Sequence, residues 1–283
     1  MIVWMIANMA NAGVLPEGAQ NIYTGVSFGT WSAFESNGNT IPVSKQDDLS
    51  VMQVLNDTQV TYGIQAGLDV TYVVPISYVK VPGKQGGALE PTLGLGQIGA
   101  SVQQEFWRFD QTALTGSAGL FTGLLHAGTR DRLTNIGDGS TQVRLGLEAE
   151  DVREIGLGFI HFNAKGQYIA KLPSNFSFDP KYPADDVTYT VTLGGGYRGY
   201  SMSVFVDGFQ RLSGVNYSES NTVDPKERFT ALKASQMKVG ISDAIALQDG
   251  WSLSGYVAHS VMAKNNPMDE WISGIGVSYY KAP

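Results

Sequence analysis

The stretch "DVTYTVTLGGGYRGYSMSVFVDGFQ", residues 186–210, alternates apolar and polar side chains on both sides of Arg198–Gly199. One face of its first half carries Val187, Tyr189, Val191 and Leu193. Because successive side chains of a strand point to opposite faces of its sheet, this pattern predicts two strands joined by a tight turn. The fold then depends on whether the apolar face is turned toward a protein core or toward lipid.

The same alternation recurs along the chain and predicts an all-β protein. We expect twelve strands, near residues 20–34, 49–64, 68–80, 97–109, 112–126, 140–150, 153–168, 186–197, 200–212, 228–242, 251–263 and 269–280. Composition agrees, because 34 glycines and only 16% charged residues disfavour helices and favour strands and turns. Pro75 lies inside an expected strand, where its missing N–H predicts a bulge.

The connections between the expected strands alternate between long and short. Those after odd-numbered strands are mostly long and polar, such as "AGTRDRLTNIGDG" (127–139). Those after even-numbered strands are mostly short, such as "QAG" (65–67), Arg198–Gly199, and turns near Asp110 and Asp151. This sorting is typical of outer-membrane barrels, which have long loops outside and short turns on the periplasmic side.

The apolar face is therefore expected to point outward to lipid. A barrel with a filled, apolar interior needs about eight strands, and this chain offers more. Aromatic residues near the expected strand ends fit an interfacial girdle, namely Trp31, Trp107, Tyr168, Tyr200, Trp251, Trp271 and Tyr280. The sequence predicts an antiparallel up-and-down transmembrane β-barrel of about twelve strands, or fourteen if a long loop hides a hairpin. The expected location is a bacterial outer membrane.

The N-terminus predicts a targeting segment. "MIVWMIANMANAG" is a short apolar run that ends in Ala10-Asn11-Ala12, the small-x-small pattern of a signal-peptide cleavage site. Residues 1–12 are interpreted as a signal peptide, truncated because a basic start is missing, and residues 13–283 as one barrel domain. The alternative is an apolar first strand or helix.

Several classes of function are disfavoured by composition and spacing. A net charge of −7 and the lack of a basic stripe argue against nucleic acid, and the lack of cysteine excludes thiolate metal sites. None of His126, His161 and His259 is followed two residues later by serine, and no Asp-x-His occurs. We therefore predict no catalytic residue, metal or cofactor. An enzyme whose partners converge from distant positions is the last alternative.

The inward face is the expected functional surface. Its glycines, which we expect to leave room in the lumen, are Gly25, Gly29, Gly99, Gly119, Gly146, Gly194, Gly274 and Gly276. The lumen-lining candidates are Tyr23, Trp31, Asp69, Glu105, Phe121, Arg144, Gly146, Glu148, Glu150, Phe205, Asp207, Phe209 and Arg211. Their mixed charges predict either a structural ion-pair network or groups that guide a solute.

Three segments carry a resemblance to a known family. They are "YGIQAGLDVTYVVPISY" (62–78), "LGLGQIGASVQQEF" (93–106) and "GLFTGLLHAGTRDRLTNIGDGSTQVRLGLE" (119–148). The chain resembles the transporters of the phenol meta-degradation pathway, which are distant relatives of FadL-type channels. Gln97 stands where that family has an aspartate after Gly-Leu-Gly, and the seven residues after Gly13 leave no room for a long FadL-type plug.

The resemblance implies a channel for passive uptake of small hydrophobic or aromatic compounds. A narrow general porin for polar solutes is the alternative that the mixed-charge lumen favours. A structural or adhesive barrel that works through its long loops is a further alternative. The expected partners are membrane lipid, lipopolysaccharide and a small-molecule solute. The oligomeric state is left open.

Overall fold

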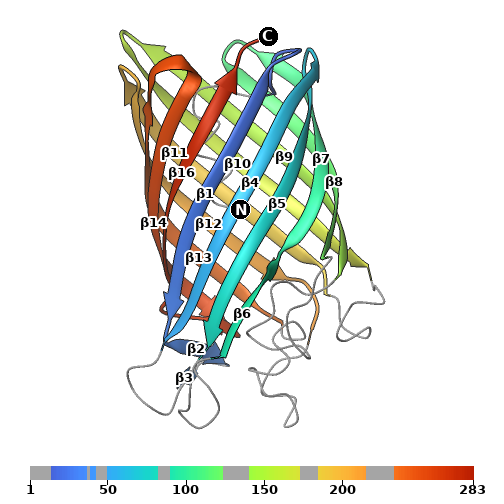
Figure 1. The fold of residues 1–283 in the computed structure, drawn as a ribbon, viewed down its shortest axis with the longest axis vertical. Helices are drawn as coiled ribbons and strands as arrows, with labels where there is room; N and C mark the ends of the chain where they lie inside the picture. The colour runs from blue at the N-terminus through green and yellow to red at the C-terminus, as the bar shows by residue number, and fades with distance from the viewer. Residues whose placement is uncertain are drawn as a thin grey trace.

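A computed structural model describes residues 14–36, 39–42, 50–81, 90–123, 140–172, 184–214 and 233–283 as a closed antiparallel barrel (Figure 1). Its wall strands are β1 (Gln20–Trp31), β4 (Val51–Gln65), β5 (Leu68–Val81), β7 (Gln97–Phe109), β8 (Thr112–Gly123), β9 (Thr141–Ile155), β10 (Gly158–Leu172), β11 (Asp186–Tyr197), β12 (Tyr200–Arg211), β13 (Ser235–Ala246), β14 (Trp251–Lys264) and β16 (Trp271–Lys281). Pairing of β1 with both β4 and β16 closes the sheet. The predicted twelve-stranded transmembrane barrel is confirmed.

Four short strands lie outside this count. β6 (Glu90–Leu95) pairs with the second half of β5. β2 (Ala33–Ser36), β3 (Asn39–Pro42) and β15 (Asn266–Pro267) form a separate small sheet. The β2–β3 hairpin thus lies in the first long connection but does not join the wall, which is why the barrel has twelve strands and not fourteen. Within the described ranges, no helix is long and apolar enough to cross a membrane.

The apolar face of the wall points outward, as the alternation predicts. On β1, Ile22, Val26 and Phe28 are 41%, 45% and 39% exposed, whereas Asn21 and Ser27 between them are buried. The same arrangement recurs around the barrel, so large apolar side chains face the surroundings and polar side chains face the lumen. This is the reverse of a water-soluble barrel, and it suits a lipid environment.

The aromatic residues near the strand ends divide between the two faces. Five of the seven are exposed on the outer face, namely Trp107, Tyr168, Tyr200, Trp251 and Trp271. Trp31 instead points into the barrel and is buried.

The strand ends that are joined by short turns share one end of the barrel, here called the turn end. The strand ends that flank the long connections share the other, here called the loop end (Figure 1). Tight turns need residues with positive φ, and Asp110, Gly156 and Arg198–Gly199 supply them. The turn expected near Asp151 lies instead at residues 156–157. Asp151 remains in the ladder because it accepts a hydrogen bond from the Thr112 hydroxyl at 2.8 Å.

Several strand boundaries differ from the expectation by a few residues, and the largest difference is at the start of the tenth expected strand. The strand expected over residues 228–242 is β13, which the structure places at Ser235–Ala246. The expected residues 228–232 lie outside the described part of the chain, as does the predicted signal peptide.

Pro75 disturbs its neighbour and not its own strand. It pairs with Asp57 in an unbroken stretch of the β4–β5 ladder, so the bulge expected there is absent. On the other side, Gly96 separates β6 from β7 and donates its N–H to the Pro75 carbonyl at 2.8 Å. A Cβ on Gly96 would lie 2.9 Å from Pro75 Cγ. The chain therefore accommodates the missing N–H by breaking the partner strand at a glycine.

The inward glycines do not leave empty space, which corrects the expectation for most of them. Aromatic rings lie flat on the wall above several: Tyr23 covers Gly25 and Gly276, Phe121 covers Gly99 and Gly119, Phe205 covers Gly240, and Tyr256 covers Gly274. A Cβ at these positions would overlap the ring. Ser117 covers Gly146, and Ser203 and His161 cover Gly194. The glycines thus admit side chains of neighbouring residues against the backbone.

This packing can be tested by adding one methyl group. In Gly99→Ala the new Cβ would overlap both the Phe121 ring and the Leu120 carbonyl oxygen. We expect the free energy of unfolding to fall by about 1–3 kcal/mol, measured by urea titration of tryptophan fluorescence in lipid vesicles. Gly166→Ala is the matched control, because a Cβ there meets no atom within 4 Å. Equal stability of the two variants would contradict the ring-on-glycine packing.

Candidate functional site

The lumen wall is polar along its length. On β11, Thr188, Thr190 and Thr192 point inward and are 7%, 4% and 1% exposed. Since the outer face takes the apolar residues, buried polar atoms inside must be satisfied by each other or by the contents of the lumen. The lumen is therefore where charged and polar groups can meet a solute.

The thirteen residues proposed from the sequence all lie at inward positions of the strand alternation, but they do not form one cluster. The buried members are Tyr23, Trp31, Asp69, Phe121, Phe205, Asp207 and Arg211. The others, partly exposed, are Glu105, Arg144, Gly146, Glu148, Glu150 and Phe209. They come from six strands and lie at different heights between the loop end and the turn end.

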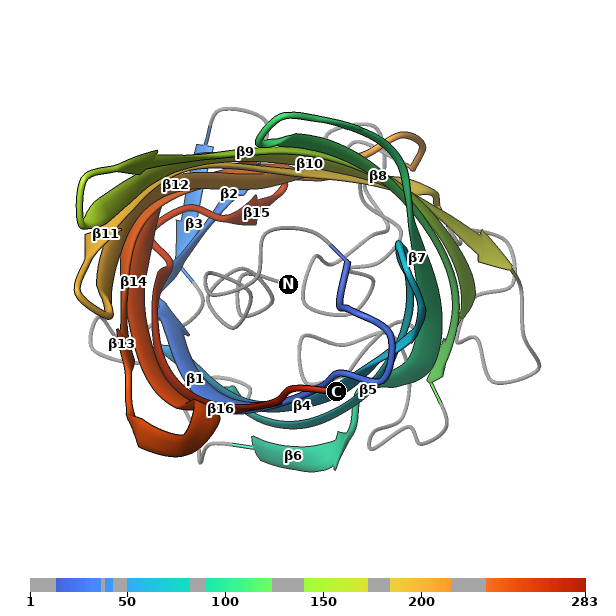
Figure 2. The ribbon, with the colours of Figure 1, turned by 90° about the horizontal axis from the view of Figure 1, so that it is seen from above.

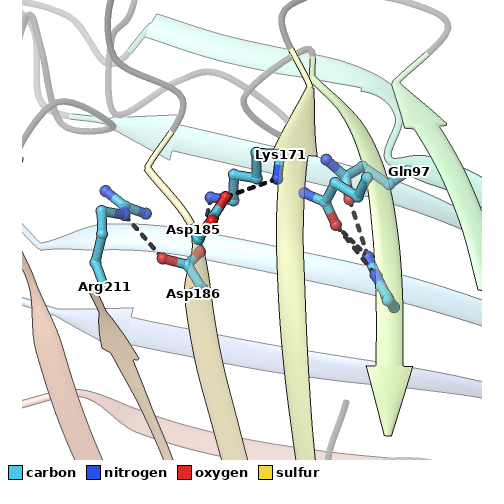
Figure 3. A network of polar contacts seen from close by, with 7 residues as sticks. Gln97, Lys171, Asp185, Asp186 and Arg211 are labelled. Carbon is cyan, nitrogen blue, oxygen red and sulfur yellow. Dashed lines mark hydrogen bonds and ion pairs between the residues drawn. The ribbon is translucent and has the colours of Figure 1, made fainter. Parts of the chain in front are cut away.

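An ion-pair cluster lies near the loop end (Figure 3). Asp186, the first residue of β11, accepts from Lys171 Nζ of β10 at 2.7 Å and from Arg211 Nε of β12 at 3.0 Å. All three side chains are largely buried, so one carboxylate holds two bases across three strands. The sequence identified Arg211 but missed Lys171 and Asp186. Both sit at strand ends beside long loops, where alternation is a weak guide to direction.

Gln97, which lies beside this cluster (Figure 3), belongs to a second contact group that is centred on Arg144. Its Nη2 donates to Gln97 Oε1 and Gln142 Oε1, each at 2.9 Å, and its guanidinium lies 3.8 Å from the centroid of the Phe121 ring. Gln97 stands at the position where the phenol-pathway transporters, which the chain resembles, have an aspartate. Here its amide oxygen helps to hold a guanidinium over an aromatic face, an arrangement stabilised by the ring quadrupole.

A further charged group joins the middle of β9 and β10 to the turn end of β5. Glu148 of β9 pairs with Lys165 Nζ at 3.1 Å and accepts from Asn163 Nδ2 at 2.6 Å. Asp69 of β5 is 4% exposed and lies within electrostatic range of Glu148 and Lys165. Side chains from β5 and from β9–β10 therefore approach each other inside the barrel.

The described N-terminal segment, residues 14–19, runs inside the wall before β1 begins (Figure 2). Leu15 is 2% exposed, and its N–H donates to Asp69 Oδ2 at 3.2 Å. Gly18 N–H donates to the Gly63 carbonyl, and Gly63 N–H to the Ala19 carbonyl, each at 2.9 Å. The Pro16 carbonyl occupies the place of a Cβ on Gly63. This short segment narrows the turn end, which the sequence did not indicate.

At the loop end, the small sheet of β2, β3 and β15 lies within the ring of wall strands (Figure 2). Gln236 of β13 donates to the Pro267 carbonyl at 2.9 Å, and Lys238 pairs with Glu270 at 2.6 Å. Asp269 accepts from the backbone N–H groups of Ser32 at 3.1 Å and Ala33 at 3.0 Å. These contacts link the connection that follows β1 to the connection between β14 and β16, and they narrow the lumen at the loop end.

Asp269 lies outside the membrane-spanning strands. Its partial burial opposes ionisation, but the Ser32 hydroxyl and the N–H groups of Ser32 and Ala33 outweigh that effect. The pKa of Asp269 is therefore lowered below its usual value. The carboxylate is the form that holds the two connections together.

Comparisons with known proteins identify the fold but not a family. No family model and no curated protein matches the chain. Among solved structures, it is similar to the COG4313 outer membrane channel from Pseudomonas putida F1, with TM-score 0.69, 16% identity, and coverage of 96% of this chain and 98% of that one. It is also similar to the transport unit of the autotransporter AIDA-I from Escherichia coli, with TM-score 0.53, 9% identity, and coverage of 97% and 95%.

The translocator domain of the autotransporter NalP from Neisseria meningitidis gives TM-score 0.52, 11% identity, and coverage of 98% and 93%. At these low identities the likeness establishes a shared barrel fold.

The docking of residues 14–19 can be tested through Gly63. Gly63→Ala places a methyl group where the Pro16 carbonyl lies, so residues 14–19 should be displaced from their contact with β4. The chain has no cysteine, so Leu15→Cys provides a single reporter that is buried when the segment is docked. We expect maleimide labelling at position 15 to speed up on the order of tenfold in Gly63→Ala, because docking protects the thiol. Gly166→Ala in the same background is the control, and an unchanged labelling rate would refute the docking.

The tie at Asp269 should depend on pH. Because its folded pKa is lowered, its stabilisation is complete above the unfolded pKa of about 3.9 and is lost as pH falls through the folded pKa. We expect Asp269→Asn to lower the free energy of unfolding by roughly 0.5–1 kcal/mol at pH 7, since water screens the partly exposed carboxylate. Urea titrations at pH 7 and pH 2.5 should show this difference shrinking toward zero. A constant difference would argue against the ionised tie.

Proposed function

We propose that this protein is an outer-membrane channel through which small solutes diffuse without energy coupling. The observation that carries the proposal is the pairing of an apolar outer face with a polar, charged inner face around a closed wall. A wall that existed only for structure would be expected to fill its interior with interlocking side chains. We place the turn end on the periplasmic side and the loop end outside, as the loop lengths suggest.

The inner lining favours polar or charged solutes. The threonines of β11 and the ion-paired cluster around Asp186 give a solute hydrogen-bond donors and acceptors along the wall. A continuous apolar path would be needed for a purely hydrophobic cargo. The aromatic rings of Tyr23, Phe121 and Phe205 are instead separated by polar positions.

Uptake of small aromatic compounds is the second candidate. Its support is the Phe121 ring with Arg144 held over one face, together with the sequence resemblance to phenol-pathway transporters. An aromatic solute that carries a carboxylate would suit both groups, because a guanidinium binds carboxylates and the ring offers an apolar surface. The solved structure named as an outer membrane channel supports transport in general and no particular cargo.

The first experiment is single-channel recording of the purified protein in a planar lipid bilayer at high salt. We expect steady, ohmic conductance steps that are small, because residues 14–19 and the β2–β3–β15 sheet narrow the two ends. Heat-modifiable migration on gels confirms beforehand that the barrel is folded. Folded protein that never conducts would reject the polar-solute channel and leave the aromatic-compound channel or a non-transport barrel.

A further inference from the structure

Two carboxylates on neighbouring strands are buried in the lumen with one oxygen each left over. Asp57 of β4 is 6% exposed, and its Oδ2 accepts from Gln59 Nε2 at 2.7 Å. Asp69 of β5 is 4% exposed, and its Oδ2 accepts from the Leu15 N–H. In the described part of the chain, Oδ1 of each residue has no hydrogen-bond partner. Both residues lie at inward positions of their strands.

A buried carboxylate oxygen without a partner is costly, and native proteins rarely tolerate it. Leaving such a group unsatisfied destabilises the folded protein, and more strongly when the group is charged. Two such oxygens on adjacent strands indicate that the lumen itself supplies the missing partner. The partner must be positive or a hydrogen-bond donor, so the choice is between a cation and water.

The charge balance around these residues favours a cation. Lys165 is paired with Glu148, and Lys238 is paired with Glu270. Lys171 and Arg211 share Asp186. Asp57 and Asp69 take part in no ion pair within the residues that the structure describes. Lys165 pairs directly with Glu148 and acts on Asp69 only from a longer range, so neither Asp57 nor Asp69 is neutralised by a directly bound base among the described residues.

The carboxylates also follow one another along the barrel axis. Asp207 lies near the loop end of β12, Asp57 lies within β4, and Asp69 is the second residue of β5 at the turn end. Asp57 and Asp207 both lie within electrostatic range of the Tyr256 hydroxyl, and Asp69 within range of Glu148. Successive acidic side chains in a narrow passage are the arrangement that passes cations and repels anions.

We infer that Asp57 and Asp69 are cation-binding positions in the lumen and make the channel select small monovalent cations, inorganic or ammonium-like, over anions. The inference rests on the proposed channel function and deepens it by naming the solute charge. The ion-pair cluster at Asp186 does not oppose it, because its two bases are partly neutralised by that shared carboxylate.

The first test measures the reversal potential under a tenfold KCl gradient. We expect the protein to prefer K⁺ over Cl⁻ on the order of fivefold, and the double variant Asp57→Asn/Asp69→Asn to reduce the ratio toward one. Asp110→Asn is the matched control, because Asp110 is exposed in a turn at positive φ, where asparagine is well tolerated. Asp69→Glu keeps the charge and should keep most of the preference, which separates charge from folding. A wild-type protein without cation preference, or an unchanged double variant, overturns the inference.

The second test does not require conduction. Crystals soaked in RbCl are measured at the rubidium absorption edge, and we expect an anomalous peak beside Asp57 or Asp69 that is absent in the double variant. A peak in a protein that does not conduct would support the cation positions and reject the proposed channel. If the protein conducts but shows neither a rubidium peak nor a preference for K⁺ over Cl⁻, the proposed channel stands and the cation positions are rejected. Water would then be the partner of the two carboxylate oxygens. Neither conduction nor a peak would reject both.

Discussion

The structure depends on the hydrogen bonding of backbone groups where water is absent. In the hydrocarbon core of a bilayer, an unpaired N–H or C=O costs several kcal/mol, so a sheet can span only when it closes. Pairing of β1 with both β4 and β16 achieves this closure. Pro75 shows how strict the constraint is. Its missing N–H is not left facing an intact strand, because the partner chain breaks at Gly96.

Closure also divides the side chains, because a strand has only two faces. The outer face carries apolar residues such as Ile22 and Val26, and the inner face carries residues whose polar groups need hydrogen-bond partners. Inside, the chain satisfies its charges partly by bridging strands, as Asp186 does for Lys171 and Arg211. Asp57 and Asp69 each keep one carboxylate oxygen without a hydrogen-bond partner among the described residues. These are the positions at which we infer that a cation binds. Structural and functional charges therefore occupy the same wall and are distinguished by their partners.

Elements that belong to no wall strand occupy part of the barrel interior. Residues 14–19 lie against Gly63 and Asp69 at the turn end, and the β2–β3–β15 sheet lies within the ring at the loop end. Aromatic rings seated on glycines take part of the remaining space. These three features reduce the open space inside the barrel, which suits the small solutes of the proposed function.

The sequence alone predicted the up-and-down wall and the direction of each face, because a period of two and the sorting of loop lengths are local properties. It left twelve or fourteen strands open, and the structure shows twelve. It fixed β7 and β11 to the residue and placed all thirteen lumen candidates at inward positions. Only the tertiary structure decided what the inward residues touch. Gly25 carries a Tyr23 ring and not empty space, Asp186 and Lys171 join Arg211, and Leu15 meets Asp69 across 54 positions. Such contacts join residues distant in sequence, and alternation tells which way a side chain points but not which side chain it meets.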